Sequence, residues 1–176
     1  MQIKKVPLNN CLYVGIDLGK TGGIAVVDGA DGKVLDLYDM PATELEIVTA
    51  LHDTIKELRE VGKQAIVIGM EQTSARPGEG VVSVRTFALN CGGVYYTCLL
   101  LSELYDNITV SRISPALWKK HFGLISPKAS SWQRKKDSVD YVNTKFKMNL
   151  KYNKNGIADA LLIAQYLRCE ADNARD

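Results

Sequence analysis

The amino-acid sequence predicts an α/β fold, in which helices flank a mixed five-stranded sheet. Five apolar runs have the length of buried strands, and segments with the apolar periodicity of helices lie between the later runs. The first three runs follow one another across short turns, which is typical of an antiparallel meander. At 176 residues the chain is long enough to bury a layered core, and we expect one domain.

The first forty residues predict three strands joined by turns. The apolar run 11–17 ends in a glycine-rich turn at 19–23, after which 24–28 continues the apolar pattern. Asp31-Gly32 is a hairpin-type turn, because aspartate and glycine tolerate the backbone angles that such turns need. Residues 33–38 form the third predicted strand.

The next segment predicts a helix followed by a strand. Thr43 is suited to cap this helix, with Glu46 as its capping-box partner. The fourth strand is 65–71, and a loop rich in Gly, Ser and Pro follows it at 73–80. The apolar stripe of the helix, at 3.6-residue spacing, consists of Leu45, Val48, Leu51, Ile55 and Leu58.

The second half of the chain is mainly helical. A long helical segment covers 81–104, and its Gly92-Gly93 pair would cost about 1 kcal/mol per glycine. Such a cost indicates close packing against another helix or a partner chain. Ser114-Pro115 matches the N-cap and first position of a further helix. The remaining predicted segments are a strand at 108–113, a helix ending near Phe122, a linker at 123–130, a basic helix at 131–147 and a last helix at 156–169. We expect residues 1–10 to be a flexible N-terminal segment and residues 170–176 to be a tail.

The composition excludes several classes of protein. No apolar run approaches the roughly 20 residues of a membrane helix, and the N-terminus lacks the apolar core of a signal peptide. Four cysteines without CxxC pairing and two histidines argue against a zinc site or a disulfide framework as the basis of the fold. We therefore expect reduced thiols in a cytosolic setting.

The net charge of +2 hides a basic segment. Between Arg112 and Lys154 there are eleven Lys and Arg residues against two acids, Asp137 and Asp140, and six aromatic residues are interleaved with them. A solvated helical face is the simpler explanation of such a run. Next to an acidic metal site, however, a basic segment favours a polyanionic substrate such as nucleic acid.

Three acidic residues stand where an apolar run ends or a helix begins. Asp17 closes the first strand, Glu71 closes the fourth, and Asp159 lies in the first turn of the last helix. Each taken alone also fits an ordinary strand-end or surface residue. A buried carboxylate is costly unless a cation or hydrogen bonds offset the lost hydration. Three of them from distant parts of the chain predict one site for a hard, oxygen-ligated cation.

The motifs around these acids resemble those of the RuvC-type Holliday junction resolvases, which have a ribonuclease H-like fold. Gly15-Ile16-Asp17-Leu18-Gly19, continued by 21–25, resembles the first motif of the family, and 68–72 resembles the second. Residues 155–164 resemble the terminal motif of bacterial, phage-encoded and plant organellar members. Gly19-Lys20-Thr21 is not a P-loop, because Walker A needs four residues between its glycines. The resemblance covers nearly the whole chain, and the predicted element order is that of the ribonuclease H-like fold.

Two basic segments resemble the parts of these enzymes that precede and form DNA-contacting helices. Residues 111–120 resemble the strand-to-helix step before a lysine-bearing helix, and 134–139 resemble the next helix. Lys136 is the candidate catalytic cation, and Lys136 and Lys120 are the candidates for phosphate contact, although a single lysine here also fits a solvent-facing role. The other DNA-binding candidates are Arg76, Arg85, Lys119, Arg134 and Lys135, and Gln72 and Asn155 are candidates for supporting the acids.

The chain departs from the family pattern in two places. Gly156 stands where many bacterial members carry a further acid or a histidine, so either three carboxylates suffice or Asn155 supplies a neutral oxygen. The loop 73–80 lacks the aromatic wedge that bacterial members use at a junction centre. Arg76 and Arg85 are placed to reach phosphates instead, and a mobile surface loop is the alternative.

The resemblance implies a metal-dependent endonuclease that resolves four-way (Holliday) DNA junctions by paired symmetric nicks, leaving 5′-phosphate and 3′-hydroxyl ends. Asp17, Glu71 and Asp159 would hold one or two Mg²⁺ ions, with Mn²⁺ as a substitute. Symmetric cutting of two strands implies a homodimer. The expected location is the cytoplasm of a bacterial or phage-infected cell, or an organellar nucleoid. The candidate interface is the helix with the glycine pair, through Val94, Leu99, Leu100 and Leu101.

Three alternatives remain from the sequence. The chain could be another ribonuclease H-like nuclease, acting on branched DNA or RNA–DNA hybrid, or a junction-binding protein without catalysis. Half of an actin-like ATPase shares the Gly-Ile-Asp-Leu-Gly opening, but a chain of this length lacks the second nucleotide-binding lobe. The presence of all three acids argues against the non-catalytic alternative.

Overall fold

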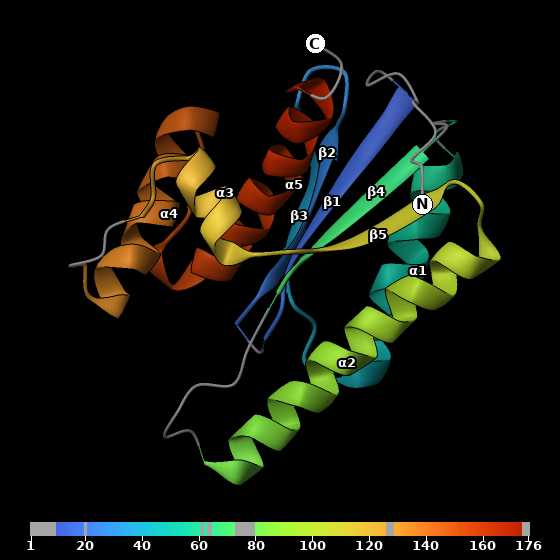
Figure 1. Ribbon diagram of the computed structural model, residues 1–176, viewed down its shortest axis with the longest axis horizontal. Coiled ribbons are helices and arrows are strands. Elements are labelled where there is room, and N and C mark those ends of the chain that lie inside the picture. The colour runs from blue at the N-terminus through green and yellow to red at the C-terminus, as the bar shows by residue number, and fades with distance from the viewer. Residues whose placement is uncertain are drawn as a thin grey trace.

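The structure, a computed structural model, describes residues 10–19, 21–60, 62, 65–72, 80–125 and 129–173. Figure 1 shows helices on both sides of a twisted sheet. The elements in chain order are β1 (Cys11–Asp17), β2 (Gly23–Asp28), β3 (Val34–Asp39), α1 (Glu44–Glu60), β4 (Ala65–Glu71), α2 (Val81–Leu104), β5 (Ile108–Ile113), α3 (Pro115–His121), α4 (Ser131–Phe146), a 3₁₀ turn η2 (Tyr152–Lys154) and α5 (Asn155–Asn173).

The five strands form one sheet in the order β3-β2-β1-β4-β5. β2 pairs antiparallel with both β1 and β3, because short turns join these three strands. β4 is parallel to β1 and to β5, since α1 and α2 carry the chain back before each new strand. The mixed five-stranded sheet predicted from the sequence is therefore confirmed.

Two hydrophobic cores lie on opposite faces of the sheet. Figure 1 shows α1 and α2 on one side and α3, α4 and α5 on the other. Successive residues of a strand point to opposite faces, and β1 serves both cores in this way. Leu12, Val14 and Ile16 belong to the core under α1 and α2, whereas Cys11 and Tyr13 belong to the core under α3, α4 and α5.

Helix α5 lies so close to the sheet that only glycine fits beneath it. A Cβ atom on Gly15 of β1 would stand 2.0 Å from the Ala160 carbonyl oxygen. A Cβ atom on Gly23 of β2 would stand 2.8 Å from the Ile157 Cα. The backbone of the first turns of α5 thus rests directly on β1 and β2, which brings the acid in those turns to the end of β1.

The predicted capping box of α1 is confirmed, and its apolar stripe needs a correction. The backbone N–H of Thr43 donates to a Glu46 carboxylate oxygen at 3.0 Å, and that of Glu46 donates to Thr43 Oγ1 at 3.3 Å. Leu45 and Val48, however, are exposed, and Ile47 is buried in their place. The buried stripe therefore begins at Ile47 instead of Leu45, because α1 is rotated about its own axis so that Ile47 faces the sheet.

The predicted interface residues of α2 do not all lie on its surface. Val94 and Leu101 pack into the core of their own chain, so for them the prediction of a partner contact is wrong. Leu99 is half-buried, and Leu100 is exposed. Close packing within the chain, the competing explanation, accounts for the buried pair.

The ends of the chain are partly described. Helix α5 continues to Asn173, so the predicted tail is helical as far as that residue, and η2 was not predicted. Residues 1–9, most of the predicted loop at 73–79 and the middle of the predicted linker at 126–128 lie outside the described residues. None of the helices in the described part of the chain is long and apolar enough to cross a membrane.

Candidate functional site

Asp17 and Glu71 end two neighbouring parallel strands. The pairing of β1 with β4 sets Ile16 beside Met70, so the acid that follows each residue leaves the sheet at the same edge. The carboxyl groups of Asp17 and Glu71 are within hydrogen-bonding contact. The charge of Glu71 is among the causes that raise the pKa of Asp17. A bound cation would offset this repulsion between the two carboxylates.

Asp159 reaches the same edge from α5. The close contact between α5 and the sheet places its first turns over β1 and β2, and a buried serine of α4, Ser138, hydrogen-bonds the Asp159 carboxylate. Helix α4 packs on α5 through Val139 and Val142, and Ser138 is next to the first of these. Four elements, β1, β4, α4 and α5, thus meet at the three acids.

The three acids interact electrostatically, which shows that they converge. Burial raises the pKa of Asp159 to about 6, and the charge of Glu71 adds to this, while the Ser138 hydrogen bond and Lys119 act in the opposite direction. Burial also raises the pKa of Asp17 well above its usual value, and the charges of Asp159 and Glu71 raise it further. Carboxylates so enclosed favour neutralisation by a proton or by a cation.

The donor set fits a hard cation such as Mg²⁺ or Mn²⁺. Glu71 Oε1 and Asp159 Oδ1 are buried without a hydrogen-bond partner, and carboxylate oxygens are the ligands that these ions prefer. In the described part of the chain, no group of three His, Cys, Asp or Glu side chains is already arranged to hold an ion. Separation of the Asp17 and Glu71 carboxyl groups is the rearrangement that would make the Asp17 oxygens available as further ligands.

Two lysines act on the acids from neighbouring helices. Lys119 of α3 lowers the pKa of both Asp17 and Asp159, and Lys135 of α4 lowers that of Asp159. The Lys119 ammonium lies 4.8 Å from the ring centroid of Trp118, which is fully buried and anchors α3. Among the residues that the structure describes, the basic side chains whose charge acts on the acids are therefore Lys119 and Lys135.

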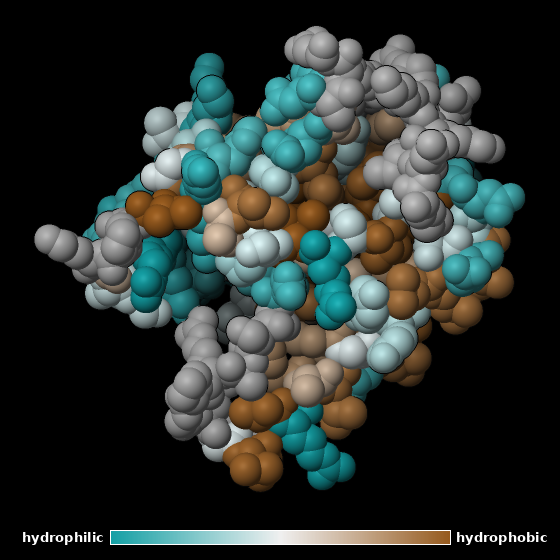
Figure 2. Space-filling model, in the orientation of Figure 1, coloured by the Kyte–Doolittle hydropathy of each residue, from teal (hydrophilic) through white to brown (hydrophobic). Residues whose placement is uncertain are grey.

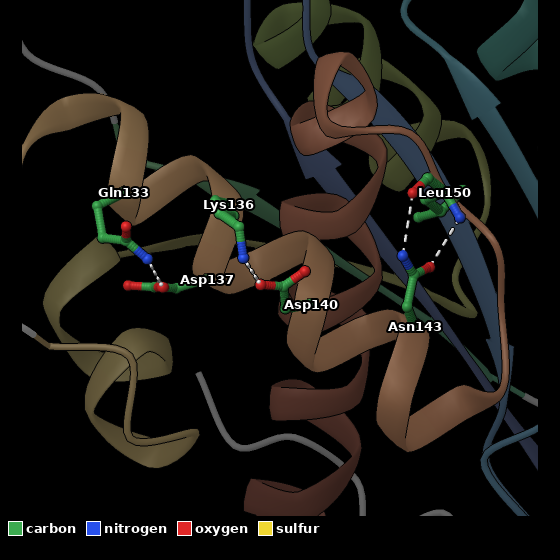
Figure 3. A network of polar contacts seen from close by, with 6 residues as sticks. All are labelled: Gln133, Lys136, Asp137, Asp140, Asn143 and Leu150. Atoms are coloured by element: carbon green, nitrogen blue, oxygen red, sulfur yellow. Dashed lines mark hydrogen bonds and ion pairs between the residues drawn. The ribbon is translucent and has the colours of Figure 1, made fainter.

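Lys136, the predicted catalytic cation, has other partners. Its ammonium forms an ion pair with Asp140 one turn along α4, and it lies 5.2 Å from the ring centroid of Tyr152. Figure 3 shows this ion pair beside a second contact three residues earlier on α4, where Gln133 Nε2 donates to Asp137 Oδ1 at 2.6 Å. The hydrogen bond to Asp140 raises the pKa of Lys136. A catalytic role for Lys136 stays a prediction.

Gly156 has a steric role that excludes any side chain. A Cβ atom on it would stand 2.0 Å from the Thr21 carbonyl oxygen and 2.6 Å from the Gly22 Cα. Gly22 and Gly156 form an isolated parallel bridge between the turn before β2 and the start of α5. A further acid or a histidine has no room at this position, and Asn155 beside it is half-buried.

The other predicted contacts are spread over several elements. Gln72 is exposed, and its backbone N–H donates to the Ile113 carbonyl at 2.8 Å, which continues the β4–β5 pairing past Glu71. The basic candidates that are exposed are Lys120 on α3, Arg134 and Lys135 on α4 and Arg85 on α2, while Arg76 lies outside the described residues.

Ser138 was not predicted from the sequence, and Lys119 was predicted only as a DNA-binding residue. Ser138 is a buried polar residue on a helix whose neighbouring buried positions are Val139 and Val142. A serine within an apolar helical stripe was the feature of the sequence that could have indicated a polar contact, because a buried hydroxyl needs a hydrogen-bond partner. The same signal pointed to no particular partner, since Asp159 is on another element.

Comparison with known proteins shows the fold. No protein-family model matches the chain, and no curated protein matches its sequence. The structure is similar to RuvC of T. thermophilus in complex with a Holliday junction substrate, with a TM-score of 0.59 and 18% sequence identity over 93% of this chain and 95% of that one. It is similar to the yeast mitochondrial Holliday junction resolvase Ydc2, with a TM-score of 0.53 and 17% identity over 96% of this chain and 82% of that one. A second structure of Thermus thermophilus RuvC has a TM-score of 0.51 and 22% identity over 93% and 96% of the two chains. The RuvC-like, ribonuclease H-like fold expected from the motifs is confirmed.

Proposed function

We propose that this chain is a metal-dependent endonuclease that recognises branched DNA and resolves four-way junctions by paired symmetric nicks. The observation that carries the proposal is the meeting of Asp17, Glu71 and Asp159 at one edge of the sheet, next to basic helices α3 and α4. The fold shared with RuvC and Ydc2 supports the same activity. Its place of action would be the cytoplasm or nucleoid, where such DNA occurs.

The three acids would hold one or two Mg²⁺ ions, with Mn²⁺ as a substitute. When bound, the metal supplies the Lewis acid that activates water and stabilises the leaving 3′ oxygen. Ser138 would hold the Asp159 carboxylate in one orientation through its hydrogen bond. The ends produced would be a 5′-phosphate and a 3′-hydroxyl.

Lys119 and Lys135 would stabilise the negative charge that develops on the scissile phosphate. Both already act on the charge of Asp159, and a positioned cation is most effective where water is partly excluded. Lys120 and Arg134, which are exposed on the same two helices, would contact flanking phosphates. The basic segment thus would hold the strand that the acids cut.

The active unit would be a homodimer formed through α2. Five large apolar residues, spaced by seven or four positions and hence on one face of this helix, are exposed by 59–79%, and Gly93 is exposed with nothing within 4 Å of its Cβ position. Figure 2 shows hydrophobic side chains gathered where α2 runs in Figure 1. Exposed apolar patches of this kind mark association sites. The five residues are Val82, Leu89, Tyr96, Leu100 and Leu104.

Cleavage of defined substrates tests the proposal. The protein is incubated with Mg²⁺ and an end-labelled immobile four-way junction, and in parallel with linear duplex and with RNA–DNA hybrid. We expect paired nicks at symmetric positions in the junction only. Asp17→Asn should abolish them, and Asp106→Asn, the same change at an exposed turn residue, should not.

Each other result selects a different function. Cutting of hybrid or linear DNA instead of the junction would keep the nuclease and replace its substrate. Tight junction binding without cutting, in Mg²⁺ and in Mn²⁺, would identify a junction-binding protein without catalysis. Cutting that survives Asp17→Asn would refute the proposed metal site.

A further inference from the structure

Two large aromatic side chains are exposed beside the basic helix α4. Trp132, in the first turn of α4, is 62% exposed, and Tyr152, in η2, is 49% exposed. Their ring centroids are 6.5 Å apart, and the ring planes are inclined at 56°. We call these two residues the aromatic pair. The rings are tilted rather than stacked on each other, and about half or more of each residue is exposed.

The segment that carries Tyr152 is fixed against α4. The Asn143 side-chain amide donates to the Leu150 carbonyl at 3.0 Å, and the Leu150 backbone N–H donates to Asn143 Oδ1 at 2.7 Å, as Figure 3 shows. At the end of η2, the Lys154 ammonium forms an ion pair with Asp39 at the end of β3. Because both flanks of Tyr152 are anchored, the aromatic pair is preorganised.

Positive charge surrounds the aromatic pair. The Lys136 ammonium lies 5.2 Å from the Tyr152 ring centroid while it is paired with Asp140, and Lys151 immediately before η2 is exposed. Aromatic rings with cations beside them are the features by which proteins bind single-stranded nucleic acid without reading its sequence. A hydrophobic partner protein would favour an apolar surround instead. The positive charge and the aromatic rings together therefore favour a polyanion with exposed rings as the ligand, namely a nucleic-acid strand with unpaired bases.

The aromatic pair adjoins the proposed active site. On α4, Ser138 hydrogen-bonds Asp159, and the charge of Lys135 acts on the same carboxylate. Residues three apart on a helix are neighbours on its surface, and Trp132 precedes Lys135 by three. A DNA strand that places a phosphate at Lys135 thus has its next bases within reach of Trp132.

We propose that Trp132 and Tyr152 form a stacking site for unpaired nucleobases of the strand that is held at the acids. This inference rests on the proposed function, and it adds a class of contact that the phosphate-binding lysines do not supply. At a branch point the pairing of bases is interrupted, and such bases can stack on an aromatic face where those inside a duplex cannot. The site would favour substrates with unpaired bases next to the cut.

Tryptophan fluorescence reports directly on this site. The chain has two tryptophans, of which Trp118 is fully buried and Trp132 is largely exposed. Binding of a short oligothymidylate to the Asp17→Asn protein in EDTA should quench the long-wavelength emission of Trp132 and leave the emission of Trp118. Trp132→Phe should remove the signal that is quenched.

Binding by variants tests both aromatic residues. Trp132→Ala and Tyr152→Ala should each weaken oligothymidylate binding by about 5- to 150-fold, the loss that corresponds to one base stacked on an aromatic ring. The dependence of binding on salt should stay that of the parent protein, since no phosphate contact is lost. Leu45→Ala, at an apolar residue that is 75% exposed on α1, is the control and should bind like the parent. Unchanged Trp118 emission shows that the variants fold.

The inference is overturned if saturating oligothymidylate leaves the Trp132 emission unchanged, or if both alanine variants bind within about twofold of the parent. Failure of the proposed function has a different signature. In that case the emission is quenched and the variants bind weakly, but the wild-type protein with Mg²⁺ does not cut the junction.

Discussion

Replacing Gly156 by alanine tests the close contact that places Asp159. The new Cβ atom would stand 2.0 Å from the Thr21 carbonyl oxygen and 2.6 and 2.8 Å from two backbone atoms of Gly22. An ordinary contact begins near 3.4 Å, so the start of α5 must move by roughly 1.4 Å. All three obstacles are backbone atoms, which no side-chain rotation can relieve.

The cost follows from these contacts. Overpacking in a core costs about 1–3 kcal/mol, and the gain in helix propensity from glycine to alanine is at most about 1 kcal/mol. The bridge between Gly22 and Gly156 must also open. We therefore expect Gly156→Ala to lower the free energy of unfolding by about 2–3 kcal/mol. A displacement of about 1 Å at Asp159 should reduce the cleavage rate by about 100-fold.

Urea unfolding followed by circular dichroism measures the first effect, and single-turnover junction cleavage measures the second. Gly92→Ala is the matched control, because its new Cβ atom would meet only Tyr96 Cε2, at 4.0 Å, inside α2. This control should gain about 0.5–1 kcal/mol. If Gly156→Ala is as stable as the wild type, the contact between α5 and the turn before β2 is too loose to exclude a Cβ atom.

Three further predictions concern charge and association. Burial raises the pKa of Asp159 to about 6, above its usual value of about 3.9. The stability that this group contributes to the metal-free protein is therefore fully present below a pH of about 4, and it is lost as the pH rises through about 6. Urea titrations should show Asp159→Asn more stable than the wild type by about 3 kcal/mol at pH 7 and equal at pH 4, and a difference that grows toward low pH would contradict this. Lys119→Ala should slow single-turnover cleavage by about 100-fold and Lys136→Ala by less than about tenfold, because Lys119 acts on the acids and Lys136 is paired with Asp140. Equal effects of the two substitutions would refute this assignment of roles. Leu100→Asp should halve the mass measured by light scattering and convert paired nicks to single ones, whereas Leu45→Asp should do neither, and a monomeric wild type would refute the α2 interface.

The convergence of the strand-end acids was predictable from the sequence. Asp17 and Glu71 each follow an apolar run, and parallel strands that are neighbours in a sheet end at the same edge. Asp159 was predictable through its motif and its place in the first turn of an apolar helix. The fold class, the bounds of most elements and the capping box of α1 depend on local patterns as well, and the structure has them as expected.

The sequence did not predict which cations face the acids. Lys135 and Lys136 are adjacent on one helix, yet Lys135 acts on Asp159 and Lys136 pairs with Asp140. Helical periodicity gives the angle between two residues of the same helix. It leaves open how far the helix is rotated about its own axis, which depends on how its side chains pack on α5.

The same limit applies to the buried face of α1 and to the two faces of α2. Ile47 is buried rather than Leu45, and Val94 rather than Leu100, because the rotation of each helix against the sheet selects one stripe among several apolar ones. The sequence by itself determined the elements, their order and the residues able to bind a cation, since these depend on neighbours along the chain. Only the tertiary structure decided how α5 lies on the glycines of the sheet and which side chains meet there, because close packing depends on atoms that are distant in sequence.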